Sequence, residues 1–383
     1  MILHNVCLAD TGNTSSIQTK ADKIVQVADT IHGDTKELML TFSDALIFPG
    51  LINSHDHLDF NLFPALGNRK YESYTEWGNH IHQTYANEIA AVLNIPTSLR
   101  ERWGVYKNLL CGVTTVVNHG EKTRHNAELI TVLEQAQSLH SVRFEKKWKQ
   151  KLNNPFKRKL PVVMHVGEGI TEAVFEEIDE FIRWNILKRK LIGVHGVSMD
   201  ARQSAHFQAL VWCPESNFFL LNATASMSEL KKNTTILFGS DSTLTGHWDI
   251  WEHLRLARKT KLLTDFELYH SLNEKPAAIW QLNSGKIATG FDADLVVTSK
   301  SGTTTGYDAF YNVRPKDILL VTHKGHIRLF DESLYEQLSG IPLREFTKIG
   351  IGKSTKFIAG DVRGLLNEIR RYKSDVQFPI TIR

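Results

Sequence analysis

The sequence predicts an α/β fold, in which a closed eight-stranded barrel stands beside a small β-domain. Three observations carry this prediction. Short apolar runs alternate with segments of helical period from Ala45 onward, which is the sign of a parallel sheet. Eight such runs can be found, the number that a barrel of this kind needs to close. Short β-branched runs and turn residues fill the two ends of the chain instead.

The eight candidate barrel strands are Leu51–Ser54, Val113–Asn118, Leu129–Glu134, Leu139–Phe144, Pro161–Val166, Leu191–Val194, Ala209–Cys213 and Thr235–Gly239. The third is ambiguous, because the run Leu129–Leu133 would equally continue a helix from Arg124. Periodicity does not separate the two over so few residues. We interpret it as a strand, which leaves almost no helix after the second strand.

Helical period and helix-start signals place the main helices between and after these strands. The expected helices are Tyr71–Val92, Pro96–Leu110, Thr171–Trp184, Trp248–Thr260, Asp265–Leu272 and Val362–Tyr372. Short strands return at Asp294–Thr298 and Ile318–His323. We therefore expect a small β-domain made of residues 1–47 and 286–383, and a barrel domain made of residues 48–285.

Composition limits the classes of protein. The 383 residues carry a net charge of +3, which is too small to imply a polyanionic partner. Three cysteines are odd in number and widely spaced, which favours a reducing compartment over a disulfide framework. No apolar run approaches the roughly 20 residues that span a bilayer, and no signal peptide is evident. We expect a cytoplasmic protein that binds neither membrane nor nucleic acid.

Ligand-type side chains stand at or just after several predicted strand ends. They are His55, His57, His165, His195 and Asp241. Alternate residues of a strand face the same side, so His55 and His57 can point at one ion while Asp56 points away. Strand ends of an α/β barrel converge on one site, and imidazoles with a carboxylate suit zinc or ferrous iron. The sequence therefore predicts a metal site, against the alternative of histidines buried for packing.

The motifs PGLINSHDHL, GSDS and GKIATGFDADLVV, with the strand-end histidines, resemble the amidohydrolase superfamily from about Ile24 to Lys300. The resemblance implies a distorted (β/α)8 TIM-like barrel with a small β-sandwich built from both chain ends. It also implies one divalent metal, Zn²⁺ or Fe²⁺, held by His55, His57, His165 and Asp241, with His195 beside the bound water or substrate.

Two further motifs resemble the deaminase and chlorohydrolase branch, which includes cytosine and guanine deaminases. They are the HxxE of His165–Glu168 and the CPxSN-like stretch Cys213–Asn217. The branch implies that Glu168 carries a proton to the leaving group; the alternative is a solvated carboxylate before an acidic helix. A lysine bridging two metals remains open, because Lys146 and Lys147 follow the predicted fourth strand, although HxxE favours one metal.

The chemistry needs these residue types. A divalent ion lowers the pKa of bound water from about 15.7 towards about 7. Asp241 can accept the proton of that water, and His195 can donate to the developing oxyanion or orient the nucleophile. Glu168 would protonate a departing amine, a step worth about 10² to 10⁴ in rate.

Other residues have open roles. A pocket role for His119 competes with a loop role, and Arg143 could hold a carboxylate or form a structural salt bridge. Asn217 could bind a ring substrate. The tryptophans Trp77, Trp212 and Trp248 are better explained as core than as substrate walls, and Cys213 as a buried thiol.

One stretch concentrates charge, with seven basic residues in the fourteen positions from Lys146 to Lys159. Interleaved aromatic residues there suggest a nucleic-acid patch, but near-balanced charge elsewhere favours a solvated outer face of the barrel.

We therefore expect a metal-dependent hydrolase of non-peptide carbon–nitrogen bonds, an aminohydrolase of a small cyclic or heteroaromatic molecule. The alternatives are a hydrolase that opens a cyclic amide or imidazolone ring, and a catalytically silent binding relative. A small-molecule substrate is the expected partner, and a homodimer is expected only from the family resemblance.

Overall fold

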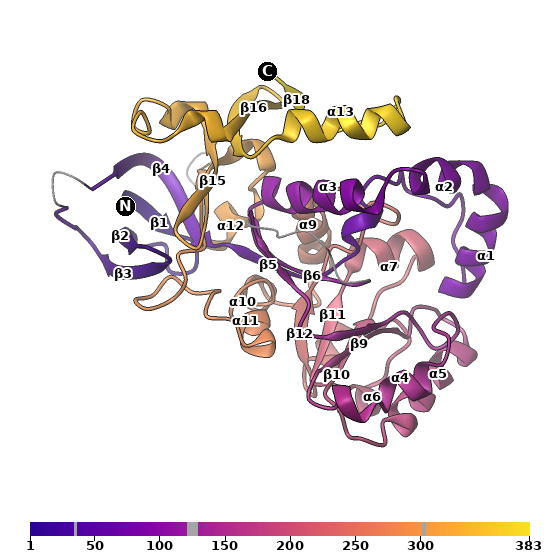
Figure 1. The fold of residues 1–383 in the computed structure, drawn as a ribbon. Helices are drawn as coiled ribbons and strands as arrows, with labels where there is room; N and C mark the ends of the chain where they lie inside the picture. The colour runs from indigo at the N-terminus through magenta and orange to yellow at the C-terminus, as the bar shows by residue number, and fades with distance from the viewer. Residues whose placement is uncertain (34–36, 121–128, 301–303) are drawn as a thin grey trace.

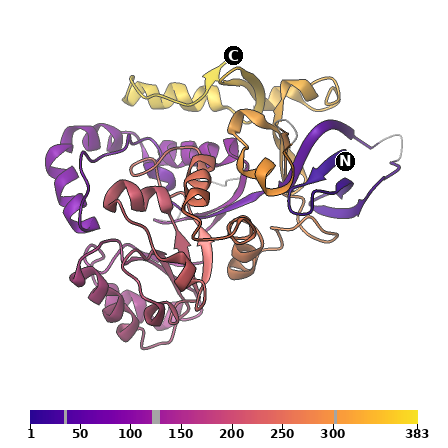
Figure 2. The same ribbon diagram turned by 180° about the vertical axis from the view of Figure 1, so that it is seen from behind.

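The computed structural model describes residues 1–33, 37–120, 129–300 and 304–383. Its strands form three sheets of ten, five and three strands. Figures 1 and 2 show the ten-stranded sheet on one side of the molecule and the two smaller sheets, with most helices, on the other.

The two smaller sheets supply eight barrel strands, in the orders β5-β6-β7 and β12-β11-β10-β9-β8. All the ladders within them are parallel. The strands are β5 (Leu51–Asp56), β6 (Val113–Asn118), β7 (Thr131–Leu133), β8 (Gln137–Leu139), β9 (Val162–Val166), β10 (Leu191–His195), β11 (Ala209–Trp212) and β12 (Thr235–Phe238).

A short segment joins the outer strands β12 and β5 where no ladder does. The backbone N–H of Phe238 donates to the carbonyl of Ser271 at 3.1 Å, and that of Ile52 donates to Leu272 at 2.7 Å. Apolar side chains fill the space inside, among them Val163, Ile192 and Val211. The α/β barrel expected from the sequence is thus present. It is distorted, because β12 and β5 are joined through Ser271 and Leu272 and not by a direct ladder.

The structure decides the position of the third and fourth predicted barrel strands. The run near Leu129 contains the strand β7; the helical alternative would have begun at Arg124, which lies outside the described residues. The predicted fourth strand, Leu139–Phe144, is wrong: β8 ends at Leu139. Local side-chain hydrogen bonds explain this, because the Glu145 carboxylate accepts the His140 N–H and Ser141 Oγ accepts the Phe144 N–H. These bonds hold a turn where a strand was expected.

Helices follow most of the strands. They are α1 (Tyr74–Thr84), α2 (Ala86–Leu93), α3 (Thr97–Leu110), α4 (Trp148–Leu152), α5 (Glu172–Trp184), α6 (Ala201–Ser204), α7 (Pro214–Leu221), α8 (Met227–Leu230), α9 (Ile250–Thr260), α10 (Asp265–His270), α11 (Glu274–Trp280), α12 (Gly306–Tyr311) and α13 (Val362–Tyr372). The helix expected at Tyr71–Val92 is divided into α1 and α2 at Tyr85. Among the described residues, no helix is long and apolar enough to cross a membrane.

The ten-stranded sheet combines both ends of the chain, as expected for the β-sandwich part. Its order is β18-β16-β17-β15-β14-β13-β4-β1-β2-β3. The strands are β1 (Ile2–Leu8), β2 (Thr14–Lys20), β3 (Lys23–Ala28), β4 (Met39–Pro49), β13 (Leu295–Ser299), β14 (Ile318–His323), β15 (His326–Asp331), β16 (Phe346–Ile351), β17 (Ser354–Ala359) and β18 (Thr381–Ile382). The central pair β4 and β13 joins the two ends; the exact domain limits near residues 47 and 286 stay a prediction.

The sheet has two apolar faces because its side chains alternate. On β4, Ile47 packs into a cluster made mainly of side chains of this sheet, whereas Leu46 and Phe48 pack into the cluster that includes the barrel helices. The helix α13 lies along α3 (Figure 1), and the ring of Trp103 in α3 meets that of Phe378, which follows α13, edge to face at 4.7 Å between ring centroids. The sheet thereby supports β5, which follows β4 directly and carries the first metal-ligand candidates.

Candidate metal centre

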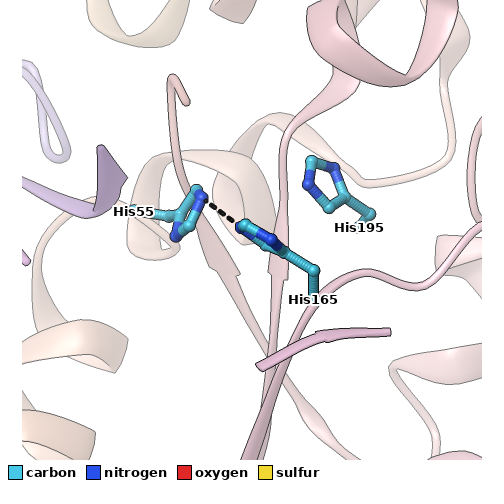
Figure 3. A group of neighbouring side chains, drawn as sticks. All are labelled: His55, His165 and His195. Carbon is cyan, nitrogen blue, oxygen red and sulfur yellow. Dashed lines mark hydrogen bonds between the residues drawn. The ribbon is translucent and has the colours of Figure 1, made fainter. Parts of the chain in front are cut away.

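Five sequence-predicted residues come together at the carboxyl ends of the barrel strands. His55 lies in β5 and His57 directly after it, His165 lies in β9, His195 ends β10, and Asp241 follows β12. All five are buried. In Figure 3, His55, His165 and His195 extend from different strands and their rings approach one another. Parallel strands deliver these residues to one point although up to 186 positions separate them in the sequence.

The donor atoms of these side chains form two neighbouring groups that share His55. The Nε2 atoms of His55 and His165 are 3.1 Å apart, and Asp241 Oδ1 is 3.6 Å from the Nε2 atoms of both His55 and His57. Two groups meet the geometric condition for holding a metal, His55/His57/Asp241 and His55/His165/His195. Imidazoles and one carboxylate are a donor set that zinc and ferrous iron accept, so the residues fit such a cation.

Burial prepares the histidines as neutral ligands. Desolvation lowers the pKa of His55 to about 4 and lowers that of His165 well below its ordinary value. Burial alone would raise the pKa of Asp241, but the hydrogen bond and charge of His55, with His57 and His195 behind it, hold that pKa well below its usual range. A carboxylate facing neutral imidazole nitrogens is the protonation state that metal ligation needs.

Backbone conformation at two of the residues is unusual. His195 has φ of 72° and Asp241 has φ of 57°, both in the left-handed region that non-glycine residues seldom adopt. Next to them, a Cβ on Gly239 would lie 2.7 Å from the Cβ of His55. Glycine at this position therefore allows β12 to approach β5 and brings Asp241 to the histidines.

Side chains around Asp241 fix its orientation. Ser216 Oγ and Thr245 Oγ1 both donate to Asp241 Oδ2, at 2.8 and 3.1 Å. The other oxygen, Oδ1, is the one that faces His55 and His57. Ser216 belongs to the CPxSN-like stretch, which thus contributes to the centre.

Glu168 and His195 form a second pair beside the ligand candidates. Glu168 Oε1 is 3.6 Å from His195 Nε2. Desolvation raises the pKa of Glu168 to about 7, opposed by the charge of His195 and helped by that of Asp241. Glu168 is buried and precedes α5, so it is not a solvated residue of the helix's first turn.

Asn217 contacts His195 and not the cavity. The Nδ1 of His195 donates to Asn217 Oδ1 at 2.9 Å, and Asn217 Nδ2 donates to Thr224 Oγ1 at 3.2 Å. Both side-chain atoms of this fully buried asparagine are thus engaged within the protein. A proton on Nδ1 leaves the Nε2 of a neutral His195 as an acceptor that faces Glu168.

A cavity of about 340 Å³ opens onto this centre. Its inner end consists of His57, His165, Glu168, His195 and Asp241, and its walls consist of Phe60, Tyr74, Trp77, Ile81, Phe144 and Leu244. Trp77 Nε1 donates to the carbonyl of Leu66 at 2.7 Å, and the Tyr74 hydroxyl donates to Glu177 at 2.9 Å. Because these polar atoms are engaged, the rings offer the cavity mainly apolar surface.

Segments that follow two of the barrel strands line this cavity. Phe60 comes from the segment between β5 and α1, Tyr74 is the first residue of α1, and Leu244 and Thr245 follow β12. Among the tryptophans considered, Trp77 lines the cavity, whereas Trp212 is in the core and donates to Thr224. Trp248 packs against the core.

The positions of Arg143, Lys146, Lys147 and Cys213 in the structure bear on the roles considered for them. Arg143 pairs with Glu177 at 2.7 Å, so it forms the structural salt bridge. Lys146 and Lys147 are exposed and do not line the cavity, which leaves no support for a lysine bridge from them. Burial raises the pKa of the Cys213 thiol well above its ordinary value, as expected of an inert cysteine.

Two further histidines, His119 and His140, lie beside the centre and contact the ring of His165. His119 is buried and its ring stacks on His165 at 4.4 Å between ring centroids, so it lies beside the centre and not in a distant loop. His140 lines the cavity, and its ring meets that of His165 at 5.1 Å. His140 was not predicted, because the fourth strand was expected to run on to Phe144. Since β8 ends at Leu139, His140 follows a strand end like the other histidines of the centre.

Comparison with known proteins relates part of the chain to one family. A model of the amidohydrolase family matches residues 145–328, which include His165, His195 and Asp241. No curated protein matches the sequence significantly.

Solved structures with similar folds include an adenosine deaminase from Xanthomonas campestris with bound zinc, at 15% identity, covering 98% of both chains with a TM-score of 0.69. A guanine deaminase from C. acetobutylicum, with bound guanine, has 14% identity, covers 85% of this chain and 99% of its own, and gives a TM-score of 0.66. The atrazine chlorohydrolase of Arthrobacter aurescens, complexed with zinc, has 14% identity, covers 85% and 94%, and gives 0.65. At these identities the likeness concerns the fold.

Proposed function

This chain belongs to the amidohydrolase family, whose model matches residues 145–328, and from that premise we propose that it is an aminohydrolase. Its substrate would be a small cyclic or heteroaromatic molecule from which it releases ammonia. The observation that carries the proposal is the buried Glu168, which lies beside the histidine and aspartate cluster at the inner end of an aromatic-lined cavity.

His55, His57, His165 and Asp241 would hold one divalent cation, zinc or ferrous iron. When bound, such a cation makes a water molecule acidic enough to ionise near neutral pH. The fit of the donor set supports this assignment, because the donors are buried and lie close together. The lowered pKa values of His55, His165 and Asp241 favour neutral imidazoles and a charged carboxylate.

Asp241 is suited to accept a proton from the attacking water. Its low pKa keeps it ionised, and Ser216 and Thr245 hold Oδ2 so that Oδ1 faces the site. Asn217 fixes the ring of His195 through Nδ1, so its Nε2 faces the site. A neutral His195 is suited to orient the nucleophile by accepting its proton at Nε2, and a protonated His195 to stabilise the oxyanion.

Glu168 is suited to act as the general acid. With a pKa of about 7, about half of the Glu168 side chains are protonated at neutral pH, where an exposed glutamate would be almost fully ionised. An amine leaves a carbon centre poorly unless it is protonated, so a proton held 3.6 Å from His195 in a buried site fits the release of ammonia. The flat, apolar walls of Phe60, Trp77 and Phe144 fit a ring beside it.

The test combines elemental analysis with an ammonia-release screen over purines, pyrimidines, triazines and pterins. We expect stoichiometric zinc or iron and ammonia release with the ring intact. His57→Ala should lose metal and turnover together. His326→Ala is the matched control, because this exposed histidine of β15 in the ten-stranded sheet does not line the cavity.

Other results would favour the alternatives. Turnover that destroys the ring's absorbance without releasing ammonia indicates opening of a cyclic amide. A metal-loaded protein that turns over no compound of these classes contradicts the proposal in favour of a silent binding relative.

A further inference from the structure

One part of the outer barrel surface combines exposed apolar side chains with a cluster of cations. Its apolar members are Phe156, Leu160, Trp184 and Ile186; its cationic members are Lys157, Arg158, Lys159, Lys188 and Lys190. We call these nine residues the basic-apolar surface. Phe156 is 98% exposed and Ile186 is 66% exposed. Large apolar side chains so exposed and so close together usually mark an interaction site.

The two segments that form this surface are bound to each other. Asn153 Nδ2 donates to the carbonyl of Trp184 at 2.7 Å, and Asn153 Oδ1 accepts from the N–H of Ile186 at 3.1 Å. The buried guanidinium of Arg189 donates to the carbonyls of Leu160 and Leu152, both at 2.9 Å. The exposed residues are therefore presented by a rigid base and not by two independent loops.

The positive charge of this surface is not cancelled by its neighbours. The nearby carboxylates Glu145 and Glu180 are already paired, with Lys151 and Lys149. Across residues 1–33, 37–120, 129–300 and 304–383, none of the five cationic members takes part in an ion pair. All five are exposed.

The surface lies at the opposite end of the barrel strands from the candidate metal centre. Residues 156–160 precede β9 and residues 184–190 precede β10, so both segments stand at the amino ends of these strands. The cavity opens at the carboxyl ends. Figure 1 places the neighbouring α4 and α5 on the side of the barrel away from the ten-stranded sheet. A partner bound here would leave the cavity open.

We propose that the basic-apolar surface binds the headgroup region of an anionic lipid bilayer, with Phe156 and Ile186 inserted between the lipids. Clustered lysines and arginines are attracted to anionic headgroups, and apolar side chains gain free energy by entering the acyl boundary. Nucleic acid fits less well. Its bases stack on free aromatic rings, but Ile186 and Leu160 are aliphatic and the Trp184 ring is covered by Lys149 Nζ at 4.5 Å.

The test is co-sedimentation of the full chain with vesicles of phosphatidylcholine alone or mixed with phosphatidylglycerol. We expect binding to the mixed vesicles only, weakening as salt rises from about 0.05 to about 0.5 M. The triple variant Lys157→Glu, Arg158→Glu, Lys159→Glu should bind at least about tenfold more weakly. Phe156→Ala should bind about tenfold more weakly at every salt concentration, because it removes apolar and not ionic contact.

Matched variants on other faces control for net charge and for exposed aromatic area. Lys20→Glu, Lys316→Glu, Lys353→Glu makes the same change of charge at exposed lysines around the ten-stranded sheet, and Phe266→Ala removes a ring that is 58% exposed. Both should bind like wild type, and unchanged thermal unfolding midpoints will show that all variants fold. Equal binding to neutral vesicles, equal losses in the controls, no vesicle binding, or binding of DNA or RNA instead would each overturn the proposal.

Discussion

The ammonium of Lys107 lies 2.8 Å from the carboxylate of Asp56, and both side chains are fully buried behind the two histidines that flank Asp56. Asn108 Nδ2 and Asn61 Nδ2 donate to the same carboxylate, at 2.7 and 2.8 Å. Asp56 points away from the centre, as the alternation of a strand requires. The hydrogen-bonded pair anchors β5 to α3 and thereby fixes where His55 and His57 stand.

We predict that Lys107→Met destabilises the protein by about 3 kcal/mol, because it leaves a buried carboxylate without its counter-charge. Denaturant unfolding measures this. The double variant Lys107→Met, Asp56→Asn should recover part of the loss, since it removes both charges. Metal content should fall in the single variant as β5 loses its anchor. A single variant within about 0.5 kcal/mol of wild type would contradict the role given to this pair.

Glu168 gives a prediction for the pH dependence of turnover. Its pKa is raised to about 7, mainly by burial, so the proton-donating form predominates below about pH 7 and is lost as pH rises through that value. We expect kcat to fall on the alkaline side with an apparent pKa near 7. Glu168→Gln should lower kcat by about 10² to 10⁴ and abolish this limb of the profile.

Glu172→Gln is the matched control for Glu168. This exposed glutamate lies in the first turn of α5, four residues further along the chain. It should retain both the rate and the pH profile of wild type. If the alkaline limb of the pH profile persists in Glu168→Gln, the limb belongs to another group and Glu168 is not the general acid.

Asn217 provides a prediction that separates orientation from binding. Asn217→Leu removes the acceptor of His195 Nδ1–H within a buried site, so the imidazole loses its fixed ring orientation and tautomer. We expect kcat to fall by about 10- to 100-fold with a smaller change in KM, as for other residues that orient a functional histidine. Steady-state kinetics on the substrate found in the screen measure the two constants. A change confined to KM would instead place Asn217 among the substrate contacts.

The metal-ligand candidates could be predicted from sequence because their signals are local. His55 and His57 are two residues apart at a strand end, and a strand turns such residues to one side. His165, His195 and Asp241 each end or follow an apolar run, and the carboxyl ends of parallel strands meet. The same reasoning would have found His140, but local side-chain hydrogen bonds at Ser141 and Glu145 end β8 earlier than its apolar pattern indicates.

The supporting contacts could not be predicted in this way. Lys107 lies in α3, and a lysine in a helix is usually a surface residue. Its partner Asp56 is 51 positions away and belongs to a different element, so no periodicity connects them. Asn217 was noticed in the CPxSN-like stretch, but nothing in the sequence pairs it with His195, which lies 22 positions earlier. Such contacts depend on tertiary structure, and the sequence showed residue types without showing pairs.

Asp249 offers a test of stability that does not involve the metal centre. It caps the amino end of α9, where its carboxylate accepts the Trp251 N–H at 3.0 Å, and burial raises its pKa to about 6. A raised pKa means that folding opposes ionisation of Asp249, so its contribution to stability is present below about pH 4 and is lost as pH rises to about 6.

Asp249→Asn keeps a capping side chain but cannot ionise. We expect the variant to match wild type near pH 4 and to be up to about 3 kcal/mol more stable above pH 6, in urea unfolding across this range. Equal stability at both pH values would show that the buried Asp249 carboxylate ionises at no cost to folding.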